Sequence, residues 1–124
     1  MSARNELDTR VDTICVSKNW RLLSTTGQCC DVHGFHAAFE SIKDVPVSRS
    51  ATAVVDKHGG TYILIVNEAL YFGPDMDHSL INPNQIRHFG IPVSDNLYDS
   101  TKPLGIDHDD LFIPFSTEGS AIYF

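Results

Sequence analysis

Two β-rich runs joined by a glycine turn constrain the fold of this chain more than any other feature. Residues 51–55 and 61–66 are rich in β-branched and aromatic side chains, and residues 56–60 between them end in Gly59 and Gly60. Glycine reaches positive φ without steric cost, so this arrangement favours a β-hairpin. A sheet is therefore expected at the centre of the fold.

One short helix is predicted, directly after a short strand at residues 79–81. Asn82 is a good N-cap, Pro83 suits the first helical position, and Gly90 suits the exit from the helix. Residues 35–42 also place apolar side chains at helical spacing, but this stretch is shorter than a typical helix.

The remaining segments read as short strands and loops. Residues 20–23 favour a strand and residues 24–27 a turn. Residues 91–110 are rich in Asp, Pro, Ser and Gly and are predicted to form a long surface loop. Residues 111–124 are predicted to form a closing β-hairpin. Together these patterns predict one all-β domain over residues 1–124, a small closed barrel or a sandwich.

The composition supports a single folded domain and limits the classes of partner that it could bind. A chain of 124 residues has the usual size of one domain, and 42% apolar with 20% charged residues is typical of globular proteins. The net charge of −7 and the scattered Lys and Arg predict no direct binding of nucleic acid. No apolar run approaches the roughly 18 to 20 residues of a membrane span. Residues 1–6 lack the apolar centre of a signal peptide, which predicts an intracellular, cytoplasmic protein.

An aspartate that follows a hydrophobic residue and precedes a hydroxyl residue can serve acid–base chemistry. Leu7, Asp8 and Thr9 have this order. In aspartic proteases, two aspartates a few ångströms apart share one proton, because like charges at that distance cannot both ionise. One of them activates water while the other protonates the substrate carbonyl. Alone, an Asp-Thr pair is equally typical of turns and helix caps.

A second segment makes the comparison specific. Residues 7–13 and 78–90 together resemble the two motifs of retropepsin-like aspartic proteases from copia-type retrotransposon polyproteins. The first motif is the catalytic loop, and the second is a pair of aliphatic residues that leads into a short helix supporting the active site. The positions that match the second motif in order and spacing are Leu80, Ile81, Gln85, Ile86 and Gly90.

The resemblance covers most of a core at residues 6–90 and carries expectations about structure and chemistry. It implies a retropepsin-like closed barrel with a flap hairpin, and a homodimer that cleaves peptide or polyprotein substrates without a cofactor. It implies that Asp8 from each subunit is catalytic and that Thr9 forms a hydrogen bond across the dimer. The expected substrate-binding residues are Arg10, Asp12, His58, Gly59 and Gly60.

The sequence departs from the family pattern at two points. Arg10 stands where the family has glycine, and a guanidinium beside Asp8 would favour the charged carboxylate and oppose the shared proton. The alternative is therefore a catalytically inactive dimerisation or peptide-binding module with the same fold. Secondly, few residues precede Asp8, whereas retropepsins have an extra N-terminal strand, which suggests an excised fragment of a longer chain.

The cysteines and histidines allow a third interpretation, a zinc-binding module. Possible ligands are concentrated at Cys29, Cys30, His33 and His36. Adjacent cysteines on a strand point to opposite faces, however, so no metal site is predicted. Three cysteines, two of them adjacent, favour reduced thiols rather than disulfides.

Overall fold

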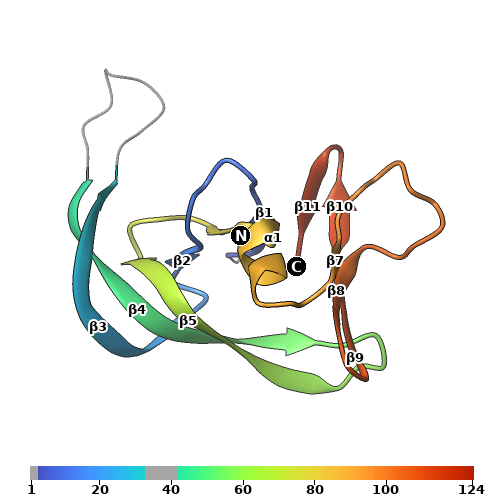
Figure 1. Cartoon of the computed structure of the whole chain (residues 1–124), viewed down its shortest axis with the longest axis horizontal. Coiled ribbons are helices and arrows are strands. Elements are labelled where there is room, and N and C mark those ends of the chain that lie inside the picture. The colour runs from blue at the N-terminus through green and yellow to red at the C-terminus, as the bar shows by residue number, and fades with distance from the viewer. Residues whose placement is uncertain (1–2, 33–41) are drawn as a thin grey trace.

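The protein is built almost entirely of β-strands. The computed structural model describes residues 3–32 and 42–124 (Figure 1). In chain order its elements are β1 (Asn5–Leu7), β2 (Cys15–Ser17), β3 (Arg21–Val32), β4 (Ile42–Val55), β5 (Thr61–Gly73), β6 (Ser79–Ile81), α1 (Pro83–His88), β7 (Val93–Ser94), β8 (Gly105–His108), β9 (Leu111–Pro114), β10 (Ser116–Glu118) and β11 (Ala121–Tyr123). The all-β prediction with one short helix is confirmed. The helical pattern at residues 35–42 falls almost wholly outside the described residues.

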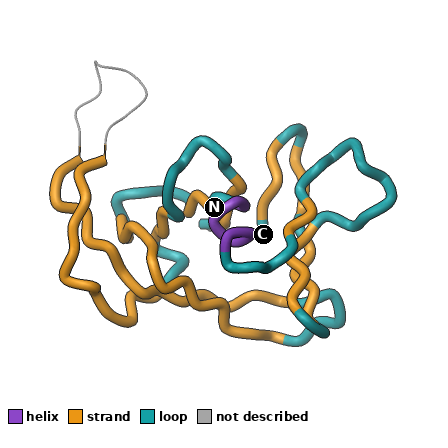
Figure 2. Tube along the Cα trace, in the orientation of Figure 1, coloured by secondary structure: helices purple, strands orange, loops and turns teal. Residues whose placement is uncertain are grey.

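The strands form two sheets. The larger has eight strands in the order β10-β11-β1-β6-β2-β5-β4-β3, and the smaller has three in the order β7-β8-β9. Figure 2 shows the long strands curving beneath the helix and the small sheet. Within the residues described, β10 and β3 end the large sheet without pairing to each other, so the predicted closure into a barrel is not found.

The predicted glycine hairpin is present between β4 and β5. Val54 pairs with Tyr62, and the turn is closed by Asp56, whose Oδ1 accepts hydrogen bonds from the backbone N–H groups of His58 (3.1 Å) and Gly60 (2.8 Å). Gly59 has a φ of 85°, which L-residues with a side chain rarely adopt. The hairpin therefore forms for the local reasons that its sequence indicates.

The prediction of a turn at residues 24–27 is wrong, because β3 continues through this segment. Gly27 has a φ of 84°, and the β3–β4 register shifts between Thr25 and Cys29. One glycine in the left-handed region is thus absorbed as a bulge in a long strand rather than reversing the chain.

Helix α1 has the boundaries that its capping residues predict. The side chain of Asn82 accepts a hydrogen bond from the backbone N–H of Asn84 (2.8 Å), Pro83 occupies the first turn, and Gly90 has a φ of 81°. The preceding strand, predicted at residues 79–81, is β6.

The C-terminal third is more structured than its composition predicts. Strands β7 and β8 lie inside the predicted 91–110 loop and pair with each other, and β9 pairs with β8. The closing hairpin is therefore shorter than residues 111–124 and consists of β10 and β11. These strands have two to four residues each, so pairing with distant segments defines them rather than periodicity.

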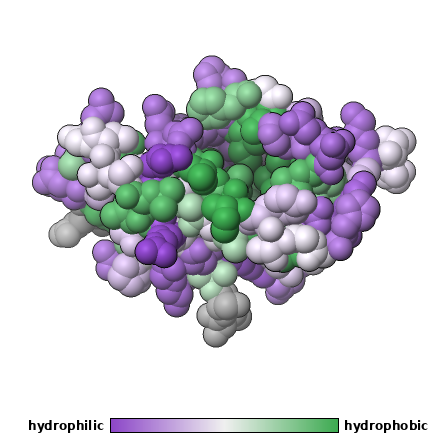
Figure 3. Space-filling view, turned by 90° about the horizontal axis from the view of Figure 1, so that it is seen from below, coloured by the Kyte–Doolittle hydropathy of each residue, from purple (hydrophilic) through white to green (hydrophobic). Residues whose placement is uncertain are grey.

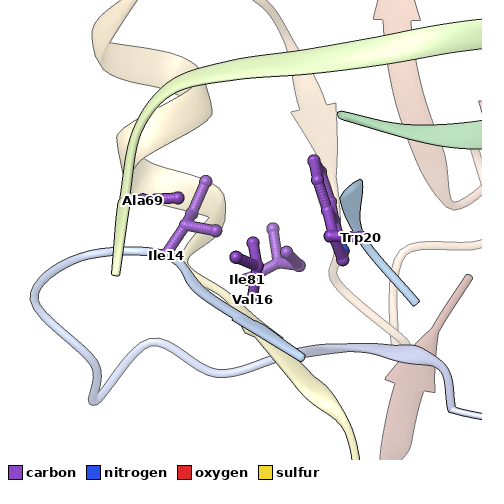
Figure 4. Packing of buried hydrophobic residues seen from close by; sticks show 5 residues of the cluster. All are labelled: Ile14, Val16, Trp20, Ala69 and Ile81. Atoms are coloured by element: carbon purple, nitrogen blue, oxygen red, sulfur yellow. The ribbon is translucent and has the colours of Figure 1, made fainter. Parts of the chain in front are cut away.

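The main core lies between β2, β5, β6 and the segment that enters β2. Figure 4 shows its buried side chains, which are Ile14, Val16, Trp20, Ala69 and Ile81. Burial of a side chain such as valine, leucine or isoleucine stabilises the fold by about 1.5–3 kcal/mol. A second cluster joins the small sheet to β4 through Val54, Val93, Ile106 and Ile113. No helix in the described part of the chain is long and apolar enough to span a membrane.

Strand β1 is an interior strand of the large sheet, third from its β10 edge. It is parallel to β6 on one side and antiparallel to β11 on the other. Asn5, on β1, is buried and accepts a hydrogen bond through its side-chain oxygen from the indole N–H of Trp20 (2.7 Å). Backbone hydrogen bonds of 2.9 Å in both directions join Asn5 to Phe124. The segment that leads to Asp8 is therefore fixed on both sides.

Candidate active-site loop

Asp8 follows β1 and begins the loop that leads to β2. Because β1 and β6 are parallel, with Leu7 opposite Ile81, the residues after both strands emerge at the same end of the sheet. The backbone N–H of Asp8 donates a hydrogen bond to the carbonyl of Ile81 (3.0 Å). The two segments that carried the sequence resemblance are thus direct neighbours in space.

Side chains at the start of α1 hold the rest of the loop. The side-chain amide of Asn82 donates to the carbonyl of Val11 (2.6 Å), and Gln85 Oε1 accepts from the backbone N–H of Ile14 (2.7 Å). Gln85 Nε2 donates in turn to the carbonyl of Glu68 on β5 (2.9 Å). Gln85 is one of the positions that match the second motif. In the structure its side-chain amide joins the end of the loop to β5.

Two groups of Arg10 approach the carboxylate of Asp8. Asp8 Oδ1 accepts a hydrogen bond from the backbone N–H of Arg10 (2.9 Å) and lies 3.5 Å from the Arg10 Nε. The Asp8 side chain is 19% exposed, whereas the Arg10 side chain is 74% exposed. An ion pair with one such exposed partner is screened by water and contributes at most about 1 kcal/mol.

Three polar residues of the loop face solvent in the protomer. Thr9 and Asp12 are exposed, as is Arg10. The structure therefore brings four of the predicted site residues, Asp8, Thr9, Arg10 and Asp12, onto one short loop. All four belong to the first motif, so their grouping follows from the sequence itself.

Cys15 lies at the base of this loop and was missed as a site residue by sequence reasoning. It is buried, and burial, followed in size by the negative charge of Asp8, raises the pKa of its thiol to about 11. Cys15 pairs with Leu70 on one side and Leu80 on the other. Further apolar side chains around this group are Val32, Val47, Phe72 and Met76. The sequence feature that could have identified Cys15 is its position, two residues after the end of the first motif.

The predicted flap residues lie elsewhere. His58, Gly59 and Gly60 form the turn between β4 and β5, and Lys57 in that turn donates a backbone hydrogen bond to the carbonyl of Phe112 on β9 (3.0 Å). In Figure 1 this turn lies beside β9, away from the loop between β1 and β2. A single protomer therefore does not bring these three residues to Asp8, and the hairpin is bound to the chain's own small sheet instead.

An apolar cavity meets the loop at its far end, where Ile14 forms part of the cavity wall. It measures about 350 Å³ and is bounded by β5, α1 and the small sheet, with Ile14, Ile81 and Gln85 in its wall. Asp8 is absent from its lining among the residues described. Figure 3 shows apolar side chains gathered near the centre of one face of the molecule, with polar side chains around them.

The described residues contain no group of three or more possible metal ligands. Cys29 and Cys30 are exposed on β3, and all three cysteines are free. His33 and His36 lie outside the described part of the chain.

Comparison of the chain with protein-family models, with curated proteins and with solved structures finds no match.

Proposed function

We propose that this protein is a retropepsin-like aspartic endopeptidase of a retroelement polyprotein, active as a homodimer. The observation that carries the proposal is the contact between the two motifs, in which the Asp8 N–H binds the Ile81 carbonyl at the end of two parallel strands. A carboxylate that follows an interior strand and is bonded in this way has a fixed backbone.

The proposed reaction needs a second copy of the chain. Two Asp8 carboxylates, one from each protomer, would share one proton. The ionised one would take a proton from water as the water oxygen attacks the peptide carbonyl carbon, and the protonated one would give its proton to the carbonyl oxygen. Collapse of the tetrahedral intermediate would break the C–N bond as the carboxyl that took the water proton gives it to the amine nitrogen. The other carboxylate would take a proton from a hydroxyl of the intermediate, which restores the singly protonated pair.

Exposure of the loop supports this arrangement. Thr9 and Arg10 are exposed in the protomer, so they are available to a second copy. Thr9 would form the hydrogen bond across the dimer that the resemblance implies.

Peptide cleavage tests the proposal directly. Purified protein is incubated with a peptide library at several pH values between about 4 and 7. The expected result is cleavage that Asp8→Asn abolishes and that the matched control Asp110→Asn, at an exposed turn, leaves unchanged. Equal cleavage by Asp8→Asn and the wild type would refute the assignment of Asp8.

The contact between Arg10 and Asp8 favours one alternative, a dimerisation or peptide-binding module without catalysis. The Arg10 Nε lies 3.5 Å from the Asp8 carboxylate, so a guanidinium occupies space beside the group that the second carboxylate would have to approach. A dimer that binds library peptides at every pH tested without cutting them would support this alternative over the enzyme.

A further inference from the structure

We infer that Gln85 is a positioning residue that fixes the Asp8 loop by bridging it to β5; this inference rests on the proposed function. The side-chain amide of Gln85 uses both of its ends, accepting from the Ile14 N–H at 2.7 Å and donating to the Glu68 carbonyl at 2.9 Å. One side chain on α1 thereby joins the end of the loop to the neighbouring strand of the sheet.

The bridge completes the hydrogen bonding of Ile14, the residue at which the loop enters β2. The Ile14 carbonyl accepts from the backbone N–H of Leu70 on β5 (2.8 Å), and Ile14 is 2% exposed. Gln85 satisfies the remaining backbone group of Ile14. Without Gln85, the Ile14 N–H would lose its partner in a part-buried position, where an unpaired donor is costly.

Anchors at both ends leave little freedom to the residues between them. The loop is held at Asp8 by the Ile81 carbonyl, at Val11 by Asn82 and at Ile14 by Gln85. Every one of these anchors comes from the segment formed by β6 and the start of α1. Because Gln85 also contacts Glu68 on β5, it ties the orientation of α1 to the sheet.

Such control matters for a pair of carboxylates that must meet across two protomers. A displacement of about 1 Å in a reacting group can lower a rate by about a hundredfold. Each protomer contributes one loop and one Asp8 carboxylate, so a substitution that loosens the loop would displace both carboxylates of the dimer. Loss of the bridge should lower kcat much more than it changes KM, since substrate is bound mainly by other groups.

Gln85→Met tests the bridge, because methionine has a similar length but makes neither hydrogen bond. The expected result is a fall in kcat of about ten- to a hundredfold with KM changed by less than about threefold. Amide hydrogen exchange at Ile14 should accelerate at least about tenfold, while exchange in the core strand residues stays at the wild-type rate. The matched control is Asn84→Ala, the exposed neighbour on α1, which should leave both quantities unchanged.

Gln85→Glu provides a second variant should methionine prevent folding. A glutamate keeps an acceptor for the Ile14 N–H, so Ile14 exchange is expected to remain within about threefold of the wild type. Wild-type kcat and Ile14 exchange in Gln85→Met, or equal loss of Ile14 protection in both variants, would overturn the inference. A wild-type protein that cuts no peptide would overturn the proposed function alone, because the exchange measurement decides the role of Gln85 without catalysis.

Discussion

The backbone and the side chain of Arg10 have different relations to Asp8. The Arg10 N–H bonds the Asp8 carboxylate at 2.9 Å, and a glycine at this position would preserve that bond. The guanidinium approaches the same oxygen at 3.5 Å and is specific to arginine. Replacement of the side chain should therefore change the charge around Asp8 without releasing the turn that orients it.

Arg10→Gly is expected to raise kcat/KM of the proposed protease. A screened surface pair contributes about 0.2–1 kcal/mol, which corresponds to a gain of up to about fivefold. Arg10→Gln serves as the control, since it removes the charge and keeps most of the bulk. A gain shared by both variants assigns the effect to charge, and a gain in the glycine variant alone assigns it to crowding of the cleft. No gain in either would contradict an inhibitory role of Arg10.

The three cysteines are expected to differ sharply in reactivity. Cys15 is buried with a pKa of about 11, whereas Cys29 and Cys30 are exposed on β3. The thiolate is the nucleophile, so a pKa raised from the ordinary thiol value of 9.0 leaves about a hundredfold less thiolate near pH 8.

Alkylation followed by mass spectrometry measures this difference. Cys29 and Cys30 should be modified first at about pH 8, with Cys15 at least about a hundredfold slower in the folded protein. Because the folded-state pKa is raised, the Cys15 rate should keep rising with pH up to about 11 instead of levelling near 9.0. Equal rates for all three cysteines in folded protein would contradict burial of Cys15.

The side chain of Asn82, at the start of α1, makes two hydrogen bonds with different purposes. Asn82 Oδ1 caps the helix by accepting from Asn84, while Asn82 Nδ2 holds the loop at Val11. The first contact is local in sequence and the second joins residues far apart. A substitution of Asn82 that keeps the side-chain oxygen and removes the N–H donor would keep the helix cap and remove the contact with Val11.

Asn82→Asp should therefore keep the helix cap and lose the loop contact. Loss of one hydrogen bond, with an oxygen now facing the Val11 carbonyl, should lower the free energy of unfolding by about 1–3 kcal/mol. Asn82→Ala, which also removes the cap, should cost about 1 kcal/mol more. Urea denaturation measures both, and equal stability of the aspartate variant and the wild type would show that the Val11 contact contributes nothing.

The sequence predicts those elements that local residues define, and it misses those that depend on distant pairing. Helix α1 was predictable because Asn82, Pro83 and Gly90 act within one short segment. The turn at Gly59 was predictable for the same reason, but its distance from Asp8 was not, because that depends on how β5 pairs with β2 far along the chain. Strands β7 and β8 were missed because each is defined by its partner rather than by its own pattern. The grouping of Asp8 with Ile81 required the two-motif resemblance.

The C-terminal tail completes the sheet around the candidate site. Strand β11 covers the side of β1 away from β6, and Phe124 stacks on Phe115 with ring centroids 5.4 Å apart. Arg4 lies over the ring of Tyr123 at 4.0 Å and pairs with Glu118 at 3.0 Å. The tail, for which the resemblance gave no role, therefore supports the strand that leads to Asp8.

Net charge sets the expected salt dependence of the proposed dimer. Each copy carries a formal charge of −7, and the Asp8 loop itself has two carboxylates, Asp8 and Asp12, against the one guanidinium of Arg10. Two such surfaces repel each other, and the screening length falls from about 30 Å at 0.01 M salt to about 10 Å at 0.1 M. The dimer dissociation constant is therefore expected to fall about three- to tenfold between these concentrations. Sedimentation equilibrium measures the dimer dissociation constant at each salt concentration.

Thr9→Ala should raise the dissociation constant at every salt concentration and leave its salt dependence unchanged, because Thr9 adds a hydrogen bond and no charge. A protein that stays monomeric at both salt concentrations, up to about millimolar protein, would exclude the shared carboxylate pair on which the proposed reaction depends.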